Sequence, residues 1–185
     1  MPAPAHDSAT RTKLLDAAER LLVAEGYPSV TSRRVEQEAG LGSKLLHYHF
    51  GNMDDLFVSM FRRRAEEGMQ RFAAAVAAEP SVRTIWEFTL DPIGYNFEFA
   101  VVARHRPAVR DEIVAVATRF RSLQTDALRD ILGRHDLLDD RLPPELLVLA
   151  MTGLNQLMAL EDGLGIEEGH GAALVAIERL LDRFD

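Results

Sequence analysis

The sequence predicts an all-α protein in which a small N-terminal helical bundle is joined by a long helix to a larger C-terminal helical bundle. Apolar residues recur at spacings of three and four through almost the whole chain, as they do in amphipathic helices. No segment shows the strict alternation of apolar and polar residues that a half-buried strand would need. The chain has 185 residues and is 47% apolar, which is enough to build a buried core.

The first helix is expected to end at Gly26 and to begin with Ser8 or Thr10 as its N-cap. Residues 1–8, rich in Pro and Ala, are expected to form a flexible arm. The apolar positions that follow the helical period are Leu14, Leu15, Ala18, Leu21 and Leu22.

Residues 31–56 predict two short helices joined by a tight turn, followed at once by another helix. Each short helix has one small apolar face, and Gly40-Leu41-Gly42 between them supplies glycines for the turn and a Leu to fill the angle. Thr31 is the expected N-cap of the first short helix, Gly42 or Ser43 that of the second, and Asn52 that of the helix that follows. The apolar pairs are Val35 with Ala39 and Leu46 with Phe50.

The second short helix would turn a cation, hydroxyls, an imidazole and an aliphatic side chain outward. These groups can bond to base edges and phosphates or touch a thymine methyl. The outward residues are Ser43, Lys44, Leu45, His47 and Tyr48.

The run from Thr10 to Leu56 resembles the DNA-binding domain of tetracycline-repressor-like (TetR-family) transcriptional regulators. The ordered features that carry the resemblance are the apolar run of the first helix, Glu25-Gly26-Tyr27, Thr31, Arg33, Val35, Ala39-Gly40-Leu41, Tyr48-His49-Phe50 and Leu56. The resemblance implies a helix-turn-helix domain over residues 1–51 and a helical effector-binding and dimerisation domain over 52–185. It also implies DNA contacts by Thr31, Arg33, Arg34, Ser43, Lys44, Leu45, His47, Tyr48 and Asn52.

Three positions depart from the family pattern. Gly42 stands where Ser or Thr usually opens the recognition helix, His47 where Tyr usually bonds to phosphate, and Met53 where Lys usually follows. The changes at His47 and Met53 put two phosphate contacts in question, and Arg34 is expected to compensate for them in part.

The C-terminal part is expected to be helical throughout. The expected helices span residues 53–78, 82–90, 93–104, 108–134, 143–163 and 171–184. The helix over 143–163 is apolar nearly all round, which predicts burial both by its own core and by a partner subunit. The last two helices are therefore expected to form a homodimer interface.

The aromatic and Met residues of this part are either ordinary core or the lining of a small-molecule pocket, because polar residues fall among them. The resemblance implies such a cavity, with a small and largely apolar effector. The candidate pocket residues are Trp86, Tyr95, Asn96, Phe99, Phe120, Met151, Asn155 and Met158.

Charge and composition restrict the alternatives. The formal net charge is −8, yet residues 1–64 carry +1 and residues 65–185 carry −9, so the acidity lies outside the candidate DNA-binding part. There is no Cys, and His47 and His49 diverge on a helix, so no metal site or cofactor is expected. No nucleophile elbow or phosphate-binding loop argues for an enzyme. The longest apolar run is shorter than the roughly 18 residues of a membrane span, which favours a cytoplasmic protein.

The sequence thus predicts a transcriptional regulator, most simply a repressor, that binds a near-palindromic operator in double-stranded DNA as a homodimer and is released by an apolar effector. Two alternatives remain. One is a regulator without a small-molecule ligand. The other is a helical binding protein or enzyme of the same fold that has lost DNA binding.

Overall fold

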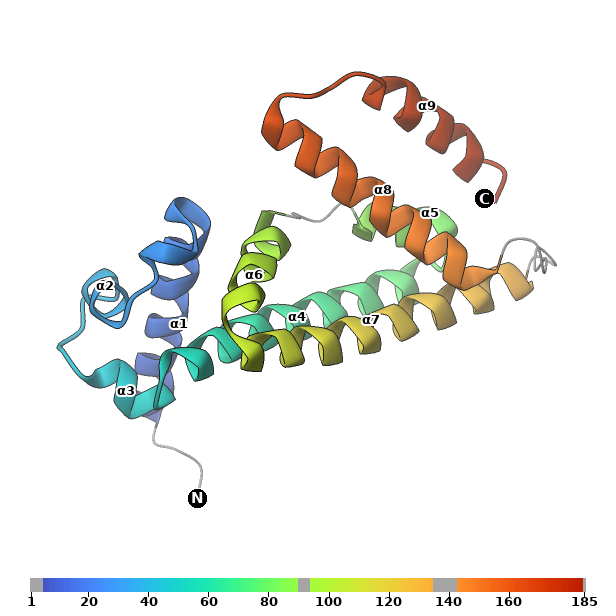
Figure 1. Cartoon of the computed structure of the whole chain (residues 1–185). Helices are drawn as coiled ribbons and strands as arrows, with labels where there is room; N and C mark the ends of the chain where they lie inside the picture. The colour runs from blue at the N-terminus through green and yellow to red at the C-terminus, as the bar shows by residue number, and fades with distance from the viewer. Residues whose placement is uncertain (1–4, 90–93, 135–142, 185) are drawn as a thin grey trace. The chain divides into compact units, whose positions relative to one another are not determined.

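A computed structural model describes residues 5–89, 94–134 and 143–184, and the described residues contain helices and no strand. Figure 1 shows the order of the helices along the chain. The chain divides into two compact units. Unit 1 comprises residues 1–66 and 94–116, and unit 2 comprises residues 67–93 and 117–185. The long helices α4 (Met53–Ala78) and α7 (Pro107–Arg134) each contribute residues to both units.

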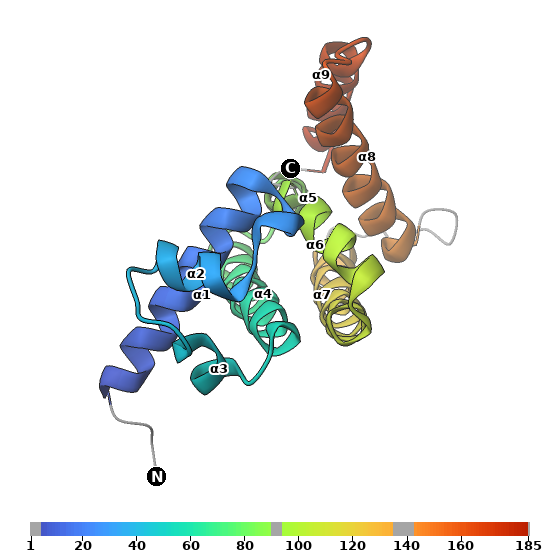
Figure 2. The ribbon, with the colours of Figure 1, turned by 60° about the vertical axis from the view of Figure 1, so that its left-hand side comes forward.

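Unit 1 is built on α1 (Ala5–Glu25), the short 3-10 helix η1 (Tyr27–Ser29), α2 (Ser32–Glu38) and α3 (Leu45–Phe50), together with the first part of α4. Figure 2 shows α3 close to the start of α4. Helix α6 (Gly94–His105) and the start of α7 complete the unit. Its core combines side chains from all these helices, among them Leu14, Leu22, Val35, Leu46, Phe57, Phe99 and Val109.

A cluster around Arg106 fastens the junction of α6 and α7 to the rest of unit 1. The Arg106 guanidinium donates to the Tyr27 hydroxyl at 3.0 Å and to the Asp54 carboxylate, and it lies over the Phe57 ring. The backbone N–H of Tyr27 donates to Glu98 on α6. Charged hydrogen bonds of this kind are stronger than neutral ones, so the first turn of α4 and the α6–α7 junction are held together.

Unit 2 contains the second parts of α4 and α7, with α5 (Val82–Thr89), α8 (Pro144–Leu164) and α9 (His170–Leu181). Its core includes the rings of Phe72, Phe88 and Phe120, whose centroids lie 5.2 to 6.0 Å apart. Such offset and edge-to-face contacts stabilise beyond the area they bury. Arg83 on α5 bonds to two carboxylates of the last helix and the residues after it, Glu178 and Asp182, which ties α5 to α9.

Two expectations about the start of the chain need correction. Helix α1 begins at Ala5, so Ser8 and Thr10 are not its N-cap and the flexible arm expected over 1–8 is helical from Ala5 onward. No Pro or Gly lies between Ala5 and Thr10 to stop the helix, and the Thr12 hydroxyl bonds back to the Ser8 carbonyl. The expected helix ends are otherwise within a few residues of those observed.

The division of the chain also differs from the expected boundary at residue 52. Residues 94–116 belong with the helix-turn-helix, because Phe99, Val102 and Val109 complete its apolar core. An isolated segment 1–51 would leave that core incomplete. This arrangement could not be foreseen from helical periodicity, which shows that a face is apolar and not which helix covers it.

Candidate nucleic-acid interface

The first short helix, α2, begins and ends with the caps that the sequence predicts. The Thr31 hydroxyl oxygen accepts a hydrogen bond from the backbone N–H of Arg34. At the other end Gly40 has φ +66°, and the N–H of Leu41 returns to the Glu36 carbonyl at 2.9 Å. This is the left-handed helix ending for which Gly is suited, since a Cβ there would be strained. Leu41 packs against the core, as expected.

The start of α3 differs from the prediction. Lys44, and not Gly42 or Ser43, is the N-cap residue, and its side chain makes no capping bond. Lys44 has φ +78° and is the one non-glycine residue of the described chain with a positive φ. The free N–H of Leu46 is instead bonded by the buried Glu36 carboxylate of α2 at 3.0 Å.

Glu36 therefore joins the two short helices, and sequence reasoning missed it. The signal that could have predicted this contact is the position of Glu36 directly after the buried Val35. A carboxylate next to a residue that points into the core can reach the neighbouring helix. A carboxylate at a helix N-terminus accepts a hydrogen bond from an otherwise unpaired N–H. Its negative charge also interacts favourably with the positive end of the helix dipole.

The pattern of exposure along α3 separates an inner and an outer face. Leu46 is fully buried and Phe50 is 5% exposed, whereas Tyr48 is 74% exposed. Of the nine residues predicted to contact DNA, eight are exposed and Leu45 is half-buried. The eight are Thr31, Arg33, Arg34, Ser43, Lys44, His47, Tyr48 and Asn52.

The two adjacent arginines of α2 differ in their surroundings. Arg34 makes two hydrogen bonds to the Glu25 carboxylate, at 2.6 and 2.7 Å, and these bonds hold the pKa of Glu25 below its usual value. Arg34 is thus paired with a carboxylate of the protein, and its contact with phosphate stays a prediction. Arg33 and Lys44 are exposed, and neither forms a salt bridge with the residues the structure describes.

Two more predicted contact residues have their polar atoms fixed by the backbone. The His47 Nδ1–H donates to the Gly51 carbonyl at 3.0 Å, because a carbonyl can only accept. Asn52 caps α4 as expected, since its Oδ1 accepts from the N–H of Asp55 and its Nδ2 donates to the Asp55 carboxylate. The Tyr48 ring meets the His49 ring edge-on, with centroids 5.1 Å apart.

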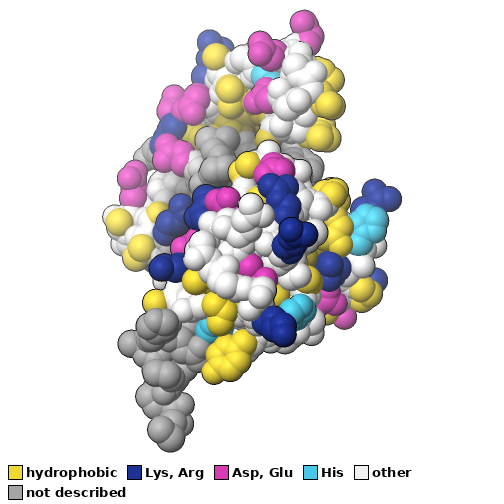
Figure 3. Space-filling view, turned by 90° about the vertical axis from the view of Figure 1, so that its left-hand side faces the viewer, with side chains coloured by type: hydrophobic (Ala, Val, Ile, Leu, Met, Phe, Trp, Pro, Cys, Tyr) yellow, Lys and Arg dark blue, Asp and Glu magenta, His cyan; other side chains and the backbone are white. Residues whose placement is uncertain are grey.

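On the face that Figure 3 shows, basic side chains do not form one continuous patch. Figure 3 shows Lys and Arg scattered among His, acidic and apolar side chains. Much of this charge is neutralised locally, because Arg63 bonds to Asp16 and Glu19 at 2.6 and 2.7 Å and Arg20 bonds to Glu38 at 2.9 Å.

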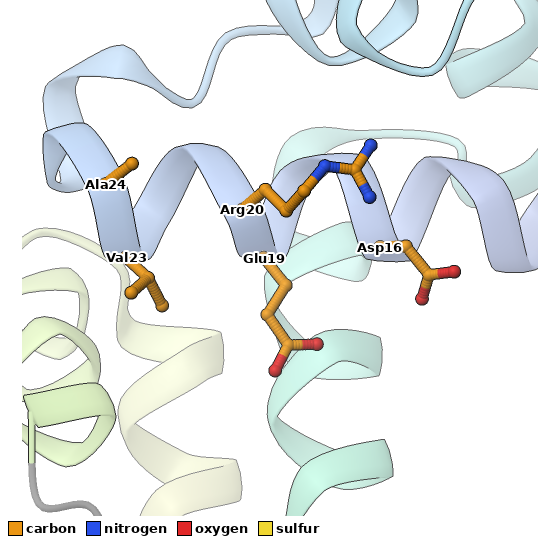
Figure 4. A pocket seen from close by; sticks show the side chains of 5 residues that line it. All are labelled: Asp16, Glu19, Arg20, Val23 and Ala24. Carbon is orange, nitrogen blue, oxygen red and sulfur yellow. The ribbon is translucent and has the colours of Figure 1, made fainter.

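A shallow surface hollow on α1 is lined by residues of that network. Its lining residues are Asp16, Glu19, Arg20, Val23 and Ala24, shown in Figure 4. Because its three charged groups are already bonded to Arg63 and Glu38, this hollow has no unpaired polar group with which to hold a ligand.

The candidate pocket residues of the C-terminal part are only partly brought together. Unit 2 holds Trp86 and Asn155, which are buried, and Phe120, Met151 and Met158, which are half-buried. Phe99 instead lies in the core of unit 1, with its ring centroid 5.1 Å from that of Phe61. The side chains of Tyr95 and Asn96 lie outside the described residues.

Other kinds of site find no support in the part of the chain that is described. There the His, Asp and Glu side chains form no group of three suited to a metal ion. None of the described helices has the length and apolar character that crossing a bilayer requires.

Two short helices packed at a tight turn, the second presenting polar side chains outward, define a helix-turn-helix DNA-binding protein. Residues 14–60 match the model of the bacterial regulatory proteins of the tetR family. Residues 14–60 thus form a DNA-binding domain of the TetR family of transcriptional regulators.

Similar proteins agree with this assignment. The chain is 27% identical to the HTH-type transcriptional repressor Rv1474c of Mycobacterium tuberculosis over 129 residues, which cover 67% of each protein. It is 28% identical to the HTH-type transcriptional repressor AcnR of Corynebacterium efficiens over 131 residues, which cover 68% of this chain and 65% of that protein. The crystal structure of a putative transcriptional regulator from Saccharomonospora viridis in complex with choline shares the fold, with a TM-score of 0.71 at 19% identity over 83% of this chain and 85% of that one.

Proposed function

We propose that this protein is a transcriptional repressor that binds a near-palindromic operator as a homodimer and is released by a small, largely apolar effector. The observation that carries the DNA-binding part is the exposure pattern of α3. Its apolar residues Leu46 and Phe50 are used in the core, while Ser43, Lys44 and Tyr48 remain open to solvent. The names of the relatives favour repression over activation.

Each exposed side chain has a chemical role at a duplex. Lys44 donates to a guanine edge or to phosphate, Leu45 touches a thymine methyl, and Ser43 and Tyr48 bond to phosphates or base edges. Thr31 and Arg33 at the start of α2 hold the backbone and fix the register. Because the Nδ1–H of His47 is engaged by Gly51, the other ring nitrogen, Nε2, is the atom offered to DNA.

The outer face of α8 supports the homodimer. Five large apolar side chains there are 46% to 69% exposed: Leu146, Leu149, Leu157, Leu160 and Leu164. Their spacing places them on the side of the helix opposite to the inward residues Val148 and Asn155. A second copy of the chain is the occupant we assign to this face, because an operator-binding dimer must place two α3 helices about 34 to 36 Å apart in successive major grooves.

The aromatic core of unit 2 and the inward face of α8 are the proposed site of the effector. An effector acts only to the extent that it binds one subunit arrangement better than the other. Helix α4 belongs to both units and begins beside α3, so it is the proposed link between effector and DNA. A cytoplasmic location follows from a role at DNA.

A gel-shift experiment with DNA from upstream of the protein's own gene tests the proposal. The wild-type protein should give a specific shift, and Lys44→Ala should weaken it and lower the salt slope by about one unit per subunit if Lys44 contacts phosphate. Arg119→Ala, which removes an exposed cation from unit 2, is the matched control and should bind as the wild type does. A protein that retards no fragment of its source genome at low salt would instead be a helical protein that has lost DNA binding.

A further inference from the structure

The amide of Asn155 on α8 is buried and only half satisfied. The residue is 2% exposed, and its Oδ1 is a buried polar side-chain atom with no hydrogen-bond partner in the described structure. A buried acceptor without a partner is destabilising, so native proteins rarely keep one without use.

The neighbouring hydrogen bonds fix which amide atom lacks a partner. The Thr89 hydroxyl donates its single proton to the Trp86 carbonyl at 2.7 Å, so toward Asn155 it can only accept. The group that bonds to it must therefore be the Asn155 amide N–H₂, as the structure has it. If the amide nitrogen and oxygen of Asn155 were exchanged, its oxygen would face the Thr89 hydroxyl oxygen, and both atoms would be acceptors. Oδ1 is thus the free atom by chemistry as well as by placement.

The residues that flank Asn155 along the inward face of α8 are apolar and adaptable. Met151 and Met158 lie about one turn before and after Asn155 on the inward face of α8, and both are half-buried. The core of unit 2 beside them contains Trp86 and Val148. Met side chains have several low-energy shapes and fill irregular gaps, so they can repack to admit a guest.

From this arrangement we infer that Asn155 is the polar anchor of the effector site and that it selects effectors carrying a neutral hydrogen-bond donor, an O–H or N–H, on an apolar body. This inference rests on the proposed release by a small molecule and names its chemical class. A carboxylate would bring its lone pairs against Oδ1. An ammonium would be buried at a site where no described carboxylate is bonded to Asn155 or Thr89, which is costly.

Matched pairs of compounds that differ in the donor test the selection. Indole is compared with indene, and 2-naphthol with 2-methoxynaphthalene, by thermal shift and by release of bound operator. The donor member of a pair should bind the wild-type protein about tenfold more tightly than its partner, which is about 1.4 kcal/mol. In Asn155→Leu the two members should bind alike, while operator binding without any compound is unchanged.

The unfolding midpoint of Asn155→Leu gives a second test that needs no ligand. Leu has a similar size and removes both the unpartnered oxygen and the bond to Thr89. Because an unpartnered buried acceptor costs more than a neutral hydrogen bond contributes, the variant should unfold at the same temperature as the wild-type protein or at a higher one. Thr89→Val is the comparison, because it breaks the bonds to both Asn155 and Trp86 and should lower the midpoint.

The outcomes separate the inference from the function it depends on. If the compounds bind but the wild-type protein does not distinguish the members of a pair, or Asn155→Leu still does, the role of Asn155 is overturned and effector control stands. A loss of stability in Asn155→Leu as large as that in Thr89→Val also overturns it, since removing Oδ1 would then bring no gain to offset the lost bond to Thr89. If none of the compounds binds, both this inference and the proposed release by an apolar effector are contradicted.

Discussion

Lys44 combines a strained backbone with an exposed charge. Replacing it by Gly should raise the stability of the protein and lower its affinity for DNA. An L-residue in the left-handed region costs about 1 to 2 kcal/mol, and Gly avoids that cost. Gly loses about 0.5 to 1 kcal/mol more backbone entropy on folding. With φ at +78°, Lys44→Gly should therefore stabilise the protein by about 0.5 to 1 kcal/mol.

The change in stability is measurable by thermal unfolding. For a chain of this size, 1 kcal/mol corresponds to about 2 to 4 °C, so the midpoint of Lys44→Gly should rise by about 1 to 4 °C. Lys44→Ala is the matched control, because it removes the charge and keeps a Cβ in the same strained conformation. Its midpoint should not rise.

Operator binding should weaken in both variants. One cation at a phosphate is worth about 1 kcal/mol per subunit, so a dimer loses about 2 kcal/mol, or roughly 30-fold in affinity. The slope of log affinity against log salt should fall by about 0.9 for each phosphate that the protein no longer neutralises. The reasoning is refuted if Lys44→Gly is less stable than the wild-type protein, or if it binds the operator with unchanged affinity and salt slope.

Two further predictions concern unit 2. Leu157→Glu places a charge on the exposed apolar face of α8 and should give a monomer by sedimentation, with unchanged helical content. The control Leu157→Met should stay dimeric. If Leu157→Glu is also dimeric, this face is not part of the interface. His170 bonds to Glu161 and Asp162 across the turn between α8 and α9, and the bond to Glu161 chiefly raises the pKa of His170 above its usual value. Because the folded state binds this proton more tightly, the stabilisation is complete below about pH 6.5 and is lost as the pH rises through the higher folded-state pKa. The unfolding midpoint of the wild-type protein should fall over that interval and that of His170→Gln should not; equal profiles would show that this pair does not contribute.

Local features of the DNA-binding region could be read from the sequence because they depend on neighbours in the chain. The caps Thr31 and Asn52 and the glycine ending of α2 at Gly40 are set by residues within four positions, and all three were predicted and confirmed. The buried face of α3 followed from the spacing of Leu46 and Phe50 in the same way.

Other features depended on side chains distant along the chain. The Glu36 carboxylate accepts a hydrogen bond from Leu46 on α3, ten residues away. The Arg34 guanidinium bonds to the carboxylate of Glu25 on the preceding helix. Phe99 could have lined a pocket or filled a core, and helical spacing is the same in both cases.

The sequence by itself determined an all-α chain, the positions of its helices and the outward chemistry of α3, because helical period, capping and turn formation are local. Only the tertiary structure decided that α6 completes the core of the helix-turn-helix and that Lys44 takes a left-handed conformation. It alone also decided that the Asn155 side-chain oxygen finds no partner among the described residues. The reason is physical: whether a side chain is covered, paired or left unpaired is fixed by whatever packs against it, and that neighbour comes from elsewhere in the chain.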